Sequence, residues 1–181
     1  MAIPAKTDVE TCPGCGVSLP TGTGPTHRYI GASAGCWAVF SALNNAGEPP
    51  LTPAPANILL VDAYAVQHPG QPSPQAVQSV AGHLLALYGV LVKSMGVDQA
   101  VWVKQRALRP GKSGKQGRFT WLSPPPLAET LTVVDIVNGA TPDARTALVA
   151  RYVTQVWEIW AQKHAAVIAD WYETFVEGDN P

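Results

Sequence analysis

Apolar residues recur at spacings of three and four along several stretches of the chain, and this spacing is typical of amphipathic helices. The clearest stretch follows Thr141, which can cap a helix, and Pro142, which suits the first helical position. It predicts a helix from there to about Val176. The residues expected on its buried stripe are Val149, Val153, Trp157, Trp160, His164, Ile168, Trp171 and Phe175.

The same reasoning predicts two helices over 57–67 and 73–93. The first should end at His68, because Pro69 disfavours helical geometry in the residue before it. The short, proline-rich connection predicts that the two helices form an antiparallel hairpin. One face of the second helix should carry Val77, Val80, Leu84, Leu87 and Leu91.

A shorter helix is expected from Ser33 to about Leu43, and the hydroxyl of Ser33 can cap it. Segments 97–108 and 119–122 fit either a strand or a helix. The pattern therefore also allows a short strand pair within 97–137. The pattern as a whole predicts a mainly α fold, an irregular helical bundle. We expect a single domain over 1–181, in which a loop-rich module at 11–45 packs on a bundle at 57–176.

The composition narrows the class of protein. The chain of 181 residues is 46% hydrophobic and 14% charged, with a net charge of -1. Disorder needs low hydrophobicity and high net charge, and a protein that coats nucleic acid needs excess positive charge. No apolar run reaches the ~20 residues that span a bilayer, and residues 1–10 lack a signal-peptide pattern. These features predict a soluble, cytoplasmic protein without a membrane partner.

The run Cys12-Pro13-Gly14-Cys15-Gly16 is the strongest chemical motif. A CxxC with glycines inside and after it is typical of zinc knuckles, because the turn brings two thiolates toward one ion. A structural zinc ion usually has four ligands. The chain has no second CxxC, so the other two must come from Cys36, His27, His68, His83 or His164. A redox pair or ordinary thiols are the alternatives.

His27 and Cys36 are the nearest candidates in sequence. We therefore predict a zinc site formed by Cys12, Cys15, His27 and Cys36, with zinc as the cofactor and a mainly structural role. The competing interpretation makes His27 a solvated loop residue and Cys36 a small core residue, since free cysteine is often buried.

A second set of residues indicates a different function. Asp62 and His83 should face each other across the hairpin, with His68 and His164 nearby. These four are the candidate catalytic residues of a metal-dependent enzyme, whose pocket would lie between the 57–93 hairpin and the C-terminal helix. The alternative is that they are hydrogen-bonded structural groups. In either case His164 is expected to contact a side chain of the hairpin, because it lies on an apolar stripe.

Basic residues form a cluster between Asp98 and Glu129, where no acidic residue occurs. An anionic ligand could bind at Lys112, Lys115 and Arg118, and a solvated loop is the alternative. The whole cluster comprises Lys104, Arg106, Arg109, Lys112, Lys115 and Arg118.

Several of these motifs occur together in one known group of proteins. With them, the chain resembles a family of small bacterial proteins that is catalogued only as a domain of unknown function. The resemblance implies a soluble protein of one domain whose Cys and His residues act as a unit, and it implies no particular activity. The motifs that carry it are Cys12–Gly16, Gly24–Tyr29, Cys36-Trp37, Asp62–Tyr64 and Gln67–Gly70.

Overall fold

The computed structural model describes residues 8–44, 51–109 and 119–178. It is mainly α-helical with one short antiparallel pair of strands, so the predicted fold class is confirmed. In chain order the elements are β1 (Val9–Thr11), β2 (Ser18–Pro20), α1 (Ala34–Asn44), α2 (Ala56–Gln67), α3 (Pro74–Leu91), a 3-10 turn (Val97–Gln99), α4 (Ala100–Ala107), α5 (Val133–Val137), α6 (Pro142–Tyr172) and a π-helical turn (Glu173–Glu177).

Helices α2, α3 and α6 pack against one another and form the centre of the bundle. Helix α3 lies between α2, α4 and α6, so it is buried on more sides than the single predicted face, and Leu85 and Ala86 are as deeply buried as Leu84 and Leu87. Thr141 caps α6 with Pro142 next in the chain, as predicted, and Ser73 caps α3 with Pro74 after it. The buried stripe of α6 includes Val149, Val153, Trp157, Trp160, Ile168 and Trp171. These tryptophans are core residues.

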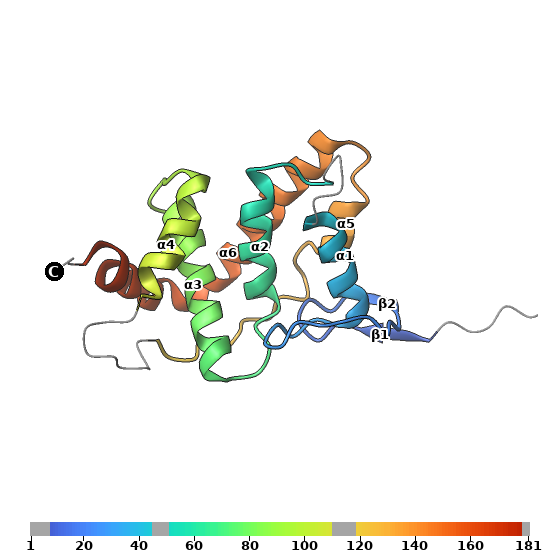
Figure 1. Cartoon of the computed structure of the whole chain (residues 1–181), viewed down its shortest axis with the longest axis horizontal. Coiled ribbons are helices and arrows are strands. Elements are labelled where there is room, and N and C mark those ends of the chain that lie inside the picture. Colours follow the sequence, from blue (N-terminus) through green and yellow to red (C-terminus); the bar gives the residue numbers. More distant parts are fainter. Residues whose placement is uncertain (1–7, 45–50, 110–118, 179–181) are drawn as a thin grey trace, which may run out of the picture.

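The other helices flank this centre. Figure 1 shows α4, α3, α2 and α1 side by side, with α6 running behind them. The ambiguous segment 97–108 is helical because Ala100, Val103 and Ala107, at helical spacing, are all buried. Helix α5 packs against α1 and α6 and is capped by the hydroxyl of Thr132.

The strand pair lies in a different place from the one predicted. In 97–109 and 119–137, the described parts of the expected range, no strand is present. Instead β1 and β2 pair antiparallel on either side of the CxxC motif, with Glu10 opposite Leu19. The hydrophobic pattern gave no sign of this hairpin because each strand has only three residues.

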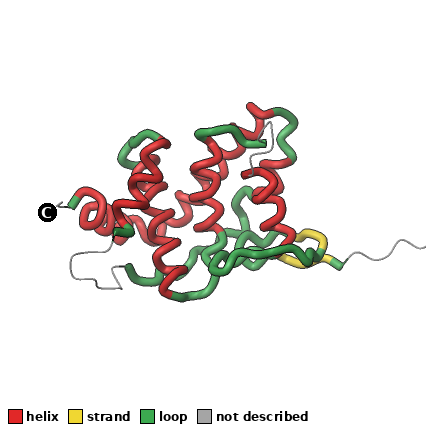
Figure 2. Tube along the Cα trace, in the orientation of Figure 1, coloured by secondary structure: helices red, strands yellow, loops and turns green. Residues whose placement is uncertain are grey.

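Most of the loops and both strands gather along one side of the helices (Figure 2). The C-terminal end of α2, the N-terminal end of α1 and the CxxC turn meet there, and this meeting places the candidate site. Among the described helices, none has a stretch long and apolar enough to cross a lipid bilayer.

Candidate metal centre

The CxxC motif forms the turn of the β1–β2 hairpin. The backbone N–H of Cys12 donates to the carbonyl of Val17 (2.8 Å), and that of Gly16 donates to the carbonyl of Cys12 (2.9 Å). Gly16 adopts a φ of 76°, in the left-handed region that favours glycine. This tight turn directs the sulfurs of Cys12 and Cys15 inward, and both residues are buried.

The first turn of α1 supplies the third sulfur. Ser33 caps α1 as predicted, because its hydroxyl accepts from the N–H of Cys36 (3.3 Å). Cys36 is therefore held in the third helical position, and its sulfur lies 3.8 Å from that of Cys15. All three cysteines are free thiols.

The C-terminal end of α2 supplies a nitrogen. Nδ1 of His68 lies 2.9 Å from the carbonyl oxygen of Tyr64 and donates its proton to it, which leaves Nε2 with a lone pair. Nε2 lies 3.4 Å from the sulfur of Cys36. A carbonyl on Nδ1 with the bare Nε2 turned toward a ligand is the usual arrangement of a metal-binding histidine.

The potential ligand atoms of Cys12, Cys15, Cys36 and His68 all lie within 4.8 Å of one another, and all four residues are buried. A tetrahedral zinc ion, with Zn–S of about 2.3 Å and Zn–N of about 2.0 Å, separates two sulfurs by about 3.8 Å and a sulfur from a nitrogen by about 3.5 Å. The distances of 3.8 Å and 3.4 Å match those edges. These four residues therefore have the chemistry and the spacing to hold one ion.

The three thiols interact strongly with one another. The pKa of Cys12 is lowered because the thiols of Cys15 and Cys36 donate hydrogen bonds to its sulfur. Each donor thiol is affected in the opposite direction. Its hydrogen bond to Cys12 is the main cause that raises the pKa of Cys15 to about 11, and the hydrogen bond from Cys36 to Cys12 is the main cause that raises the pKa of Cys36. A positive ion at the centre would offset the repulsion among three thiolates.

Further groups hold the ligands in place. The hydroxyl of Tyr64 donates to the sulfur of Cys36 (3.6 Å), and the backbone N–H of Ser33 donates to the sulfur of Cys12 (3.5 Å). Burial is the main cause that raises the pKa of Tyr64, so this hydroxyl keeps its proton. Its ring stacks on Phe40 at 3.9 Å. Such outer contacts orient metal ligands and tune their affinity.

Glycines allow the surrounding loops to approach His68. Gly31 donates its N–H to the carbonyl of His68 (3.0 Å) and lies against Gly70, which has a φ of 69°. A Cβ on either glycine would collide with the backbone of the 29–31 loop or of the turn at Gly70. The sequence Gln67–Gly70 thus positions the imidazole of His68 and ends helix α2.

His27 is the expected ligand that the structure does not bring to the thiols. Its ring packs on Tyr29 (4.4 Å between centroids) and Trp37 (5.3 Å), and it is absent from the Cys3His cluster. This placement has a simple geometric reason. Nearness to Cys36 along the chain is irrelevant here, because the sulfurs face the end of α2, and His68 is the residue at that end.

The proposed set Asp62, His68, His83 and His164 is not brought together either. His68 belongs to the thiol cluster. Asp62 and His83 do face each other, with Oδ1 and Nδ1 2.6 Å apart, as the hairpin geometry predicted. Lys104 completes that group, with its Nζ 2.5 Å from the same oxygen.

His164 lies on a different surface. It is half-buried, its Nε2 is 2.9 Å from the carbonyl oxygen of Ser123, and its ring packs beside Trp160. Among the described residues it makes no hydrogen bond to the 57–83 hairpin, and its hydrogen-bond partner is Ser123 instead. The carbonyl of Ser123 also accepts from Lys163, so the segment around Ser123 contacts this part of α6.

Gln67 is a buried polar residue whose role the sequence did not reveal. Its amide nitrogen donates to the hydroxyl of Thr130 (2.6 Å) and the carbonyl of Leu131 (2.9 Å), and its oxygen accepts from Tyr152 (2.8 Å). It thereby joins α2, the 127–131 segment and α6 directly beside the candidate ligand His68. A polar residue one position before a candidate ligand was the only signal.

The basic cluster disperses where the structure describes it. Lys104 pairs with Asp62, and Arg106 donates to the carbonyls of Val176 and Gly178. Lys112, Lys115 and Arg118, the expected site for an anionic ligand, lie outside the described residues.

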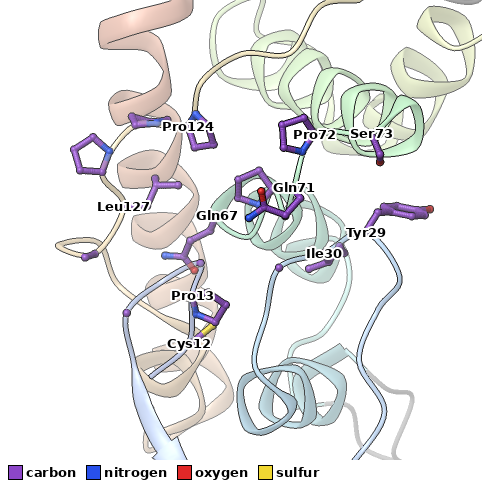
Figure 3. A pocket seen from close by; sticks show the side chains of 18 of the residues that line it. Cys12, Pro13, Tyr29, Ile30, Gln67, Gln71, Pro72, Ser73, Pro124 and Leu127 are labelled. Carbon is purple, nitrogen blue, oxygen red and sulfur yellow. The ribbon is translucent and has the colours of Figure 1, made fainter. Parts of the chain in front are cut away.

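A cavity of about 750 Å³ adjoins the centre on the side of Cys12. Figure 3 shows Pro13 and Gln67 near Cys12, with Tyr29 and Ile30 on another wall and Pro124 with Leu127 opposite. Cys12 lines this cavity yet is only 1% exposed, so the cavity lies beside the four ligand atoms and not among them.

Comparison with known proteins places the chain in a family that has no assigned activity. Neither the curated proteins nor the solved structures contain a match to the chain. One family model matches residues 10–161, a range that includes all four residues of the Cys3His cluster. The chain therefore belongs to DUF5946, a family of unknown function.

Proposed function

We propose that the protein binds one zinc ion through Cys12, Cys15, Cys36 and His68, and that the ion has a mainly structural role. The observation that carries this proposal is the convergence of four buried ligand atoms within 4.8 Å. They come from three separate segments: the β1–β2 turn, the start of α1 and the end of α2. A single ion at this point would cross-link all three.

The ligand set favours a structural ion over a catalytic one. Structural zinc sites have four protein ligands, of which cysteines are the commonest, whereas catalytic sites leave one position for water or substrate. Here four ligands are available, and each is at most 1% exposed. The distances of 3.8 Å from Cys36 to Cys15 and 3.4 Å from Cys36 to His68 suit one ion better than a cluster of several irons.

The proposal also accounts for how the small N-terminal hairpin is held. Strands of three residues offer little apolar surface, and an isolated two-stranded hairpin is marginally stable in water. The ion would attach this hairpin to α1 and α2. In this proposal the chain is a single domain in a reducing cytoplasm, where its thiols stay free to bind metal.

Replacement of one histidine tests the ligand set. His68→Gln should reduce bound zinc from about one ion per chain to well below half, because three ligands of a closed site remain. Elemental analysis of protein purified without a chelator gives the metal content and also identifies the metal. His27→Gln is the matched control and should keep the full content. Full zinc in His68→Gln, or loss of zinc only in His27→Gln, would contradict the proposed set.

Acid should release the metal. The pKa values of Cys15 and Cys36 are raised without metal, so protons compete with the ion for these sulfurs. The affinity for zinc should therefore fall steadily as the pH is lowered from about 8 to about 5. A zinc indicator dye in a pH series measures the release. The Cys36→Ser variant, with one thiol fewer, should show a shallower dependence. An affinity independent of pH would contradict thiolate ligation.

A further inference from the structure

A second cluster of charged side chains lies apart from the thiols, where α2, α3 and α4 meet. Asp62 of α2 is fully buried and accepts from both His83 of α3 (2.6 Å) and Lys104 of α4 (2.5 Å) at the same oxygen. Its other oxygen, Oδ2, is buried and has no hydrogen-bond partner among the described residues. The carboxylate thus fixes the position of two cationic or potentially cationic groups.

Those two groups line a cavity of about 240 Å³. The side chains of His83 and Lys104 are each 19% exposed, so they are open to a ligand from the cavity. Among the residues that the structure describes, no acidic one lines it. Six of the lining residues can donate hydrogen bonds from their side chains: Tyr29, Gln75, Gln78, Ser79, His83 and Lys104. Lined by donors and free of carboxylates, the cavity has the character of an anion-binding site.

The hydrogen bond to Asp62 determines which atom of His83 meets a ligand. Nδ1 carries the proton that the carboxylate accepts, so Nε2 is the ring nitrogen left for the cavity. It has no hydrogen-bond partner among the described residues. In the neutral ring Nε2 presents a lone pair and repels an anion, whereas in the protonated ring it becomes a donor. Binding of an anion would therefore be coupled to uptake of a proton at this atom.

We propose that this cavity binds the oxyanionic group, phosphate or carboxylate, of a small molecule through Lys104 and protonated His83. Ser79 and the glutamines of α3 supply further donors, and Asp62 acts as a positioning residue behind the site. Among the described residues, the titratable groups that face His83 are Asp62 from α2, Lys104 from α4 and Tyr29 from the loop between β2 and α1. The site does not depend on the proposed zinc ion.

Titration of the zinc-loaded full chain with sulfate, which stands in for phosphate, tests the proposal. Sulfate keeps its charge across the neutral range, so any dependence on pH comes from the protein. Binding measured by calorimetry should be stronger at about pH 6 than at about pH 8, because Nε2 of His83 donates to an anion only in the protonated ring. Acetate serves as the second probe, and the tighter of the two indicates whether the natural group is phosphate or carboxylate.

Variants locate the binding and separate it from folding. His83→Gln should weaken sulfate binding about tenfold at the lower pH and abolish its dependence on pH. Ser79→Ala leaves Asp62 and its two partners intact, so it should weaken binding without loss of stability. His164→Gln changes a half-buried histidine elsewhere, so it should alter neither sulfate binding nor stability. Absence of binding by both probes, or binding that persists with the same pH dependence in His83→Gln, would overturn the proposal.

Discussion

Exchange of both cysteines of the β1–β2 turn, Cys12→Ser with Cys15→Ser, should yield protein without bound zinc whose melting temperature is lower by about 10–20 °C. The four candidate ligand atoms come from three segments that meet at this end of the bundle, so an ion would cross-link them. Structural zinc contributes about 10–16 kcal/mol to the folding of small zinc-binding peptides. Loss of the ion should cost this protein only part of that amount, because its helices retain their own core.

A chelator provides the control for this variant. Wild-type protein freed of zinc should melt at the temperature of the double variant, and the chelator should not affect the variant further. Agreement between the two would assign the loss to the ion, since serine itself changes the packing very little. A metal-free wild type that melts at the original temperature would show that no ion stabilises the fold.

The helices could be predicted from the sequence because they are long and their signals agree with one another. Thr141 and Pro142 mark the start of α6, Ser73 marks the start of α3, and the apolar spacing continues for several turns in each. The β1–β2 hairpin gives no comparable signal. Its strands are short, and they owe their position to the CxxC turn between them.

The candidate metal centre could be predicted only in part, for a physical reason. The CxxC motif is local, so Cys12 and Cys15 could be assigned as a pair from their spacing. The candidate nitrogen ligand, His68, is placed by tertiary packing at the end of α2, whereas the ring of His27 packs on Tyr29 and Trp37. Distance along the chain therefore favoured His27, whereas the packing brings His68 to the thiols.

The contact between Asp62 and His83 could be predicted because it follows from helix geometry alone. Two helices joined by a short turn place these residues at similar heights. Lys104 comes from α4, whose position on α3 no local pattern defines, and His164 is covered by a loop with no regular structure around Ser123. Local sequence signals thus predict the contacts within the α2–α3 hairpin. The remaining contacts depend on how the later segments pack on that hairpin.

A methyl group at Gly14 should disturb the proposed zinc site without removing a ligand. A Cβ there would lie 2.8 Å from Cγ of the His68 ring, closer still to its Cδ2, and 3.0 Å from the carbonyl oxygen of Gln67. The ring cannot easily move away, because its Nδ1 donates a hydrogen bond to the carbonyl of Tyr64. Gly14→Ala should therefore weaken zinc binding about 10–100-fold, the usual effect of disturbing groups that orient a ligand.

Gly24→Ala is the matched control for this change. A Cβ at Gly24 would meet no atom within 4 Å, so this variant should bind zinc like the wild type. Competition with a chelator of known affinity measures both variants. Combination with His68→Gln gives a sharper test, since Gly14→Ala should have little further effect on zinc once the ring it displaces is gone. An equal loss in both backgrounds would show that Gly14 acts on the hairpin alone and that the nitrogen of His68 is not a ligand.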